Sequence, residues 1–151
     1  MCEAIATSNA ISDHYGKTAF FPDVLDTYMK MNLVLDGYGG TSPLSIPILL
    51  STEGINTVFY YADDLTPEKY QYLCESCDGV ILTSWNTENP SDAIHTMYIE
   101  IDEAPESSTG YSCLRHNDDT KLHSTPDNDL QALVEGYNPD GAICIIGVMK
   151  E

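Results

Sequence analysis

Four residues of the chain have the types and the spacing of a zinc site. Cys74 and Cys77 are separated by two residues, and Cys113 and His116 repeat this spacing later in the chain. Thiolate and imidazole ligands in short pairs are what a tetrahedral zinc ion prefers. Cys74 also falls inside a predicted helix, where a buried thiol facing the core explains it equally well. We expect the four residues to be scattered and the protein to carry no cofactor.

A glycine-rich loop after an apolar run, residues 33–35, could surround a small molecule. The loop consists of Asp36, Gly37, Tyr38, Gly39, Gly40, Thr41 and Ser42. A dinucleotide-binding turn has the pattern Gly-x-Gly-x-x-Gly, but serine stands at the third glycine position here. Asp63 closes the next strand, where an acid would meet a ribose hydroxyl. A Walker A loop is excluded, because the chain contains no Gly-Lys-Ser or Gly-Lys-Thr.

Two short stretches resemble motifs of the haloacid-dehalogenase-like hydrolases. Residues 33–36, Leu-Val-Leu-Asp, resemble the nucleophile strand of that family, and residues 80–84, an apolar strand ending in Thr83 and Ser84, resemble its second motif. The resemblance implies a hydrolase built on Asp36. The family's acid two residues after the nucleophile is replaced by Tyr38, and no late acidic pair follows a strand to hold magnesium.

The other nucleophile and histidine motifs are also incomplete. Residues 123–125, His-Ser-Thr, are similar to one half of the paired motif of the two-histidine phosphoesterases, and the second half is absent. The Gly-x-Ser-x-Gly turn of serine hydrolases is absent too. Because no catalytic set is complete, the sequence favours a protein without enzymatic activity.

The elements that must position these residues alternate between strands and helices. The predicted strands are residues 33–35, 57–61, 80–83, 96–101 and 142–148, and the predicted helices are residues 22–31, 46–53, 67–76 and 127–135. Thr66-Pro67-Glu68 marks a helix start. In strand 96–101, Tyr98 and Glu100 alternate with apolar residues, which predicts an exposed face. Apolar strands alternating with helices are typical of a parallel sheet covered on both faces. We therefore predict an α/β fold, Rossmann-like or flavodoxin-like, with a mostly parallel sheet of about five strands.

The length of 151 residues fits a single domain. We divide it into an N-terminal extension with a helix (1–30), a core (31–101), an acidic loop excursion (102–124) and a final helix and strand (125–149). Ligands of parallel sheets bind beyond the carboxyl ends of the strands. The predicted ligand-binding residues are Asp36, Gly37, Gly39, Gly40, Thr41, Ser42, Asp63, Asp64 and Ser84.

Charge separates the function classes most clearly. Twenty-four Asp and Glu face six Lys and Arg, for a net charge of −18. Binding to a nucleic-acid backbone or to an anionic membrane needs clustered bases and is excluded as a charge-driven function. A negative surface instead steers association with a basic partner. The acids expected to meet that partner are Asp102, Glu103, Glu106, Asp118, Asp119, Asp127 and Asp129.

The leading hypothesis is therefore a non-enzymatic acidic protein that binds or inhibits a basic protein, for instance one that handles nucleic acid. Its composition is similar to that of small viral or phage inhibitors of host systems. Two alternatives stay open: a Rossmann-like module that binds a nucleotide or sugar phosphate at Gly37–Ser42, and an unusual hydrolase built on Asp36. Five cysteines without a signal peptide indicate a reducing, cytoplasmic location. The oligomeric state stays open.

Overall fold

The computed structural model of the protein describes residues 2–16, 22–24, 26, 44–85, 94–116, 122–124, 130–137 and 141–150. Its strands are β1 (Thr57–Tyr61), β2 (Cys77–Trp85), β3 (Ile94–Glu103), β4 (Tyr111–His116), β5 (Leu122–Ser124) and β6 (Ala142–Met149). Its helices are α1 (Cys2–Tyr15), α3 (Ser45–Thr52), α4 (Pro67–Ser76) and α5 (Leu130–Tyr137), with a short 3-10 turn η1 (Ala62–Asp64). The predicted strand at residues 33–35 lies outside the described residues.

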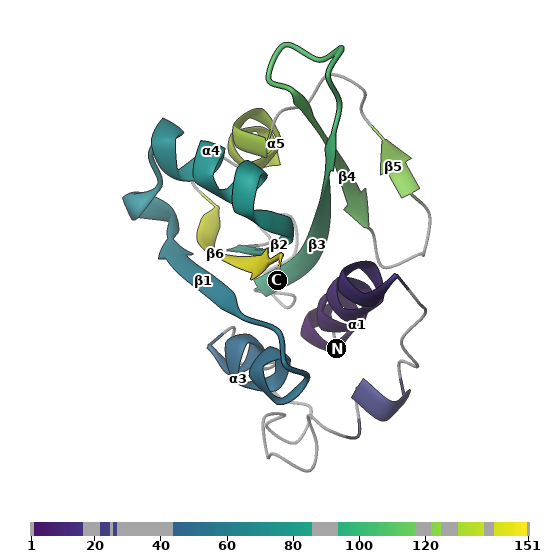
Figure 1. Ribbon diagram of the computed structural model, residues 1–151. Helices are drawn as coiled ribbons and strands as arrows, with labels where there is room; N and C mark the ends of the chain where they lie inside the picture. Colours follow the sequence, from purple (N-terminus) through teal and green to yellow (C-terminus); the bar gives the residue numbers. More distant parts are fainter. Residues whose placement is uncertain are drawn as a thin grey trace.

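All six strands belong to one sheet with the order β1-β6-β2-β3-β4-β5, and every neighbouring pair is antiparallel (Figure 1). The prediction of a mostly parallel, Rossmann-like or flavodoxin-like sheet of about five strands is therefore wrong. β6 lies between β1 and β2, so those two strands point the same way without pairing. A small-molecule module that depends on a parallel sheet is ruled out together with that fold.

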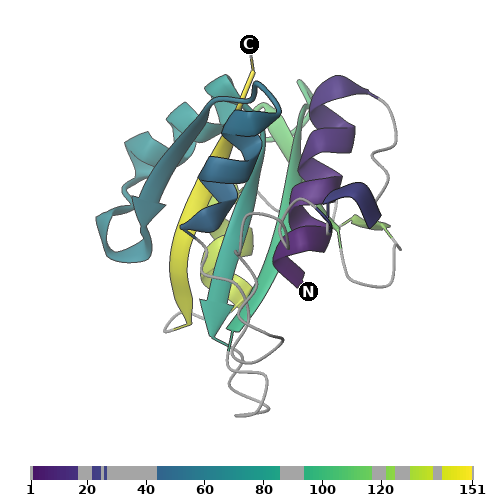
Figure 2. The same ribbon diagram turned by 90° about the horizontal axis from the view of Figure 1, so that it is seen from below.

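Burial on both faces explains why the strands looked parallel. Helices α1 and α3 cover one face of the sheet, and α4 and α5 cover the other (Figures 1 and 2). In β6, Ile146 and Val148 pack under α1 and α3, while Ile145 packs under α4 and α5. A strand covered on both faces is apolar along its whole length, whichever way its neighbours run.

Helix α4 lies close against the sheet at a glycine. A Cβ at Gly147 would come within 2.7 Å of Leu73 on α4, of Cys77 on β2 and of Val58 on β1. Only a residue without a side chain fits there, because interiors are packed without spare volume. Gly147 in β6 thus sets the spacing between α4 and the sheet.

Three further expectations need correction. Tyr98 is fully buried, because α1 covers the face of β3 that the alternating pattern predicted to be exposed. Residues 102–124 are more ordered than a loop excursion, because β3 continues to Glu103 and residues 104–110 connect it to β4. The N-terminal helix begins at Cys2 and ends at Tyr15, where no helix was expected. Of the helix predicted at residues 22–31, the structure describes residues 22–24 and 26, all helical.

The start of α4 was predicted correctly and offers a direct test of helix capping. The Thr66 hydroxyl accepts a hydrogen bond of 3.3 Å from the backbone N–H of Lys69. We expect Thr66→Ala to lower the free energy of unfolding by about 1 kcal/mol, since one N–H loses its acceptor. Urea denaturation followed by circular dichroism measures the change. Thr66→Ser keeps the acceptor and should stay close to wild type; an equal loss in both variants would contradict the cap.

Candidate functional site

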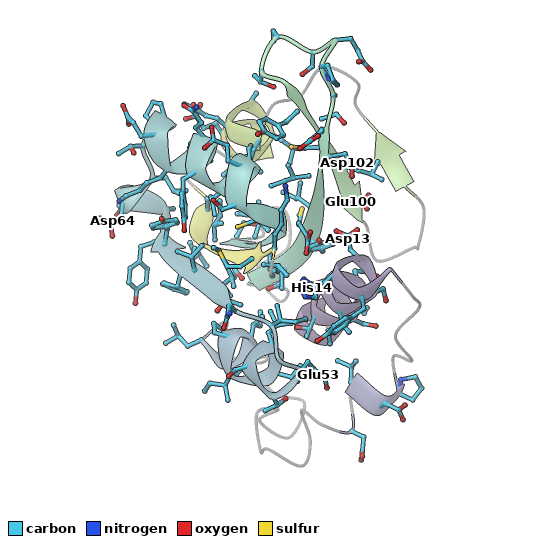
Figure 3. The ribbon with its side chains drawn as sticks, viewed as in Figure 1. Asp13, His14, Glu53, Asp64, Glu100 and Asp102 are labelled. Carbon is cyan, nitrogen blue, oxygen red and sulfur yellow. The ribbon has the colours of Figure 1, made fainter. Side chains whose placement is uncertain are left out.

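The end of α1 brings ionisable side chains together against the sheet (Figure 3). The Tyr98 hydroxyl donates a hydrogen bond of 2.5 Å to the Asp13 carboxylate. Glu100, two residues further along β3, also forms a side-chain hydrogen bond with Asp13. One carboxylate on the helix is thus held by two groups on one strand.

A second contact joins the same helical turn to β2. His14 Nδ1 lies 2.6 Å from Asp78 Oδ2, and the two side chains are 7% and 26% exposed. Tyr15 adds a hydrogen bond from its hydroxyl to the backbone carbonyl of Glu53, just after α3. Three consecutive residues of α1 therefore fasten its last turn to three different segments of the chain.

The local sequence explains how these groups meet. Small side chains of α1, Ala6, Thr7 and Ala10, are buried against the sheet, which lets the helix axis approach closely. On β3, Tyr98 and Glu100 are two positions apart and point to the same face. Gly79 of β2 leaves room for Tyr98, because a Cβ there would collide with its ring.

The environment changes the acidity of two groups. Burial, followed by the hydrogen bond to Asp13 and the charges of Asp13 and Asp102, raises the pKa of Glu100 to about 8. A pKa raised in this way favours the protonated form of Glu100 near neutral pH. Burial, reinforced by the charge of Asp13 and the hydrogen bond to it, holds the pKa of Tyr98 far above its ordinary value. Tyr98 stays a neutral hydrogen-bond donor at all physiological pH values.

This arrangement suits a structural role better than a catalytic one. A carboxyl pair that shares a proton resembles an acid–base pair in an active site. Here, however, the Tyr98 side chain is fully buried and its hydroxyl is used inside the protein. We therefore interpret Asp13, His14, Asp78, Tyr98 and Glu100 as an ionisable latch that holds α1 on the sheet.

The residues predicted to bind a ligand are only partly described. Asp63 and Asp64 are exposed in η1, directly after β1. Ser84 is buried near the end of β2, and its hydroxyl has no hydrogen-bond partner in the described part of the chain. β1 and β2 point the same way, so these residues lie at the same end of the sheet, near the carboxyl ends of two strands that β6 separates. The others, Asp36, Gly37, Gly39, Gly40, Thr41 and Ser42, lie outside the described residues.

The cysteines of the proposed zinc set belong to the apolar core. Cys74, Cys77 and Cys113 are buried in the cluster between the sheet and α4 and α5. Burial and neighbouring charges raise the pKa of the Cys77 thiol to about 12, which disfavours the thiolate that a metal would need. The side chain of His116 is not among those described. No group of three His, Cys, Asp or Glu able to hold a metal ion occurs within the described residues.

Part of the predicted acidic region is exposed as expected. Asp102 and Glu103 end β3, Glu106 lies in the turn before β4, and all three side chains are exposed. Asp118, Asp119, Asp127 and Asp129 lie outside the described residues. The region that can be described is therefore the β3–β4 turn.

Two helices carry further exposed carboxylates, and their charges act on tyrosines of α4 and β4. Glu75 of α4 accepts a hydrogen bond of 2.9 Å from Gln71, and Glu135 of α5 accepts one of 3.0 Å from Gln131. Partial burial raises the pKa of Tyr111 on β4, and the charges of Glu75 and Glu103 raise it further, so these two carboxylates lie around one tyrosine. We call Glu75, Glu103, Glu106 and Glu135 the acidic surface; all four are exposed.

Sequence reasoning missed the latch and two residues of the acidic surface. Asp13 and His14 end a segment whose sequence predicted no element, Asp78 was expected in the turn before the strand at residues 80–83, and Glu100 was expected on an exposed strand face. The Gln-x-x-x-Glu spacing at Gln71–Glu75 and Gln131–Glu135 was readable, since such residues face each other on a helix. The pairing of Asp13 with Glu100 had no local signal.

Comparisons with protein-family models, with curated proteins and with solved structures give no match to this chain. Within the part of the chain that the structure describes, none of the helices has both the length and the apolar character needed to cross a membrane. The proposals for function therefore rest on the geometry and the charges of the chain itself.

Proposed function

We propose that the protein is a binding protein that presents its acidic surface to a basic protein partner. The observation that supports this is how the carboxylates are held. Glu75 and Glu135 accept hydrogen bonds from neutral glutamine amides, which orient them without cancelling their charge. A partner with Lys and Arg in matching positions would complete these interactions and gain speed of association from the long-range field.

Lys69, one base of the described chain, does not pair with this surface. Its ammonium group donates a hydrogen bond of 2.6 Å to the backbone carbonyl of Asp64. It also lies 5.2 Å from the centre of the Tyr60 ring. With a net charge of −18, the chain repels phosphate backbones and complements proteins that bind them. The partner class that fits is a protein with a basic groove of the kind that holds nucleic acid.

The proposed location is the reducing interior of a cell. Among the described residues, Cys74, Cys77, Cys113 and Cys144 are buried and form no disulfide. Several cysteines without disulfides are typical of proteins in a reducing compartment.

The test of the proposed function removes charge from the acidic surface without changing side-chain size. We expect the triple variant Glu75→Gln, Glu103→Gln, Glu106→Gln to lose the basic proteins that the wild type retains from cell extract. Exposed surface substitutions of this kind change stability by at most about 0.5 kcal/mol each, so the fold should persist. Quantitative mass spectrometry of the retained proteins at increasing salt gives the measurement.

A variant of equal charge change serves as the control. Glu68→Gln with Asp23→Asn and Asp26→Asn also removes three charges, from exposed positions outside the acidic surface and away from the ends of β1. It should retain the same basic proteins as wild type. Two outcomes would contradict the proposal. One is equal retention of basic proteins by both triple variants. The other is retention that does not weaken as added salt shortens the electrostatic screening length to about 8 Å.

A further inference from the structure

Within the described residues, the outermost strand of the sheet, β1, pairs along one edge only. It pairs with β6 on one side, and Figure 1 shows no described strand or helix beyond it on the other. The opposite edge strand, β5, has three residues, whereas β1 has five. A free edge carries a row of backbone donors and acceptors that can pair with another chain.

The hydrogen-bond pattern identifies which groups on β1 are free. The backbone carbonyl of Asn56, just before β1, accepts a hydrogen bond of 3.0 Å from Met149. In an antiparallel ladder, residues alternate between bonding to a given neighbour and pointing away from it. Asn56, Val58 and Tyr60 therefore bond toward β6. The N–H and C=O groups of Thr57, Phe59 and Tyr61 point outward, and no described residue provides them with a partner.

The free edge also lacks the features that usually protect such strands. Exposed edges are commonly blocked by charged residues, proline or a bulge. β1 has the sequence Thr-Val-Phe-Tyr-Tyr, with regular pairing along its length. The rings of Phe59 and Tyr61 pack edge to face with centroids 4.9 Å apart, and Tyr61 is 55% exposed. Aromatic side chains therefore flank the open backbone groups, as they do in many peptide-binding sites.

Charges at the two ends of β1 decide between a second copy and a different partner. Glu53 lies shortly before the strand, and Asp63 and Asp64 follow it directly; all three are exposed. In an antiparallel pair of two copies, Asp63 and Asp64 of each would lie toward Glu53 of the other. Like charges facing each other across strands are destabilising. A segment that carries lysine or arginine at its ends would instead meet these three acids, beside one described base, Lys69, at the Asp64 carbonyl.

We propose that the free edge of β1 binds an extended segment of a basic partner as an added strand. The segment would pair with the backbone of Thr57, Phe59 and Tyr61 and place its basic residues near Glu53, Asp63 and Asp64. This is the mode in which backbone hydrogen bonds supply affinity and flanking side chains supply specificity. The inference rests on the proposed function only in taking the partner to be basic.

A synthetic peptide with alternating threonine and valine and two lysines at each end is the probe. We expect it to bind the full chain and to slow hydrogen exchange at the amides of Thr57, Phe59 and Tyr61, measured by nuclear magnetic resonance. The amides of Val58 and Tyr60 already bond to β6 and should change little. The same peptide with glutamates in place of its lysines should bind at least about 10-fold more weakly, since each close charge pair contributes up to 1 kcal/mol.

Variants of the strand test the backbone contacts. Thr57→Pro removes one outward N–H that the ladder to β6 does not use, and proline is tolerated at the first residue of a strand. It should weaken peptide binding about 3–10-fold, the value of one hydrogen bond. Thr57→Val keeps the N–H and should bind like wild type. If Thr57→Pro fails to fold, the hydrogen-exchange pattern of the wild type with the peptide still tests the strand addition.

The outcomes separate this inference from the proposed function. The variant that lacks three charges of the acidic surface should still show peptide protection at Thr57, Phe59 and Tyr61. Peptide binding without protection at these amides would overturn the strand addition, even if basic proteins still bind the acidic surface. Equal binding of the lysine and glutamate peptides would overturn the basic partner. Protection of the same amides in the protein alone, with sedimentation as a dimer, would assign the edge to a second copy.

Discussion

Replacing Gly79 with alanine is expected to lower the free energy of unfolding by about 3 kcal/mol or more, a fall in melting temperature of roughly 6–12 °C. A Cβ at this position would lie 2.5 Å from the carbonyl oxygen of Ile99 and would also meet the ring of Tyr98. The carbonyl belongs to β3, which pairs with β2 along its length, so it moves only if the strands part. Elsewhere in a strand the same substitution would be mildly stabilising. Thermal unfolding followed by circular dichroism measures the loss.

Making the same substitution in a Tyr98→Leu protein shows whether the Tyr98 ring causes part of the loss in stability. In a Tyr98→Leu protein the ring is gone, and Gly79→Ala should cost less than it does in wild type. The difference between the two losses is the coupling between the positions. An unchanged melting temperature for Gly79→Ala would contradict the close packing, and equal losses in both backgrounds would remove the ring from the explanation.

Glu100 is expected to make stability fall as pH rises from about 4.5 to about 8. Its pKa is about 8 in the folded protein and 4.5 in a free side chain, so the folded state binds more protons between these values. Stability is therefore fully present below pH 4.5 and is lost progressively up to pH 8. Because solvent screens a partly exposed carboxyl, we expect a loss of about 1–2 kcal/mol, or about 3–6 °C in melting temperature.

The Glu100→Gln variant isolates this contribution. Glutamine does not titrate but can still donate to Asp13, so its melting temperature should depend less on pH over this range. The other groups of the latch, Asp13, Asp78, His14 and Tyr98, are unchanged and appear in both curves. Glu106→Gln, an exposed change on the same hairpin, should keep the wild-type slope. Parallel curves for wild type and Glu100→Gln would show that the carboxyl pair does not share a proton.

Much of the local structure could be predicted from the sequence. The cap at Thr66 and the proline after it placed α4 at Pro67–Ser76, the bounds that the structure has. The strands at residues 57–61 and 142–148 correspond to β1 and β6. Each of these elements carries its own signal within ten residues or so, in the form of a cap, a β-branched run or a turn.

The direction of the strands could not be predicted in the same way. The apolar run of β6 reports that both of its faces are covered, and helices cover both faces here. Its antiparallel pairing with β1 and β2 depends on contacts far apart in the chain. Apolar runs are frequently found in parallel sheets, but this is a statistical association. What makes such a strand apolar is the burial of both of its faces, which occurs in antiparallel sheets as well.

The latch was hidden for a related reason. Asp13 and Tyr98 are 85 positions apart, and no pattern within either segment points to the other. Helix α1 buries Ala6, Thr7 and Ala10, small residues that give a weak periodic signal compared with leucine or isoleucine. Of the acidic residues, those near the β3–β4 turn were expected from composition alone. Glu75 and Glu135 needed the packing of α4 and α5 to place them.

The position of β6 has a consequence for how the protein forms during translation. It is the last of the described strands to be synthesised, yet it fills the gap between β1 and β2. A nascent chain that has released β1 and β2 therefore holds two apolar strand edges with no strand to join them. Such contacts between distant segments form slowly, and unpaired edges are prone to aggregation until they form. Because β6 follows every other described strand in the chain, the sheet between β1 and β2 can be completed only after those strands have been synthesised.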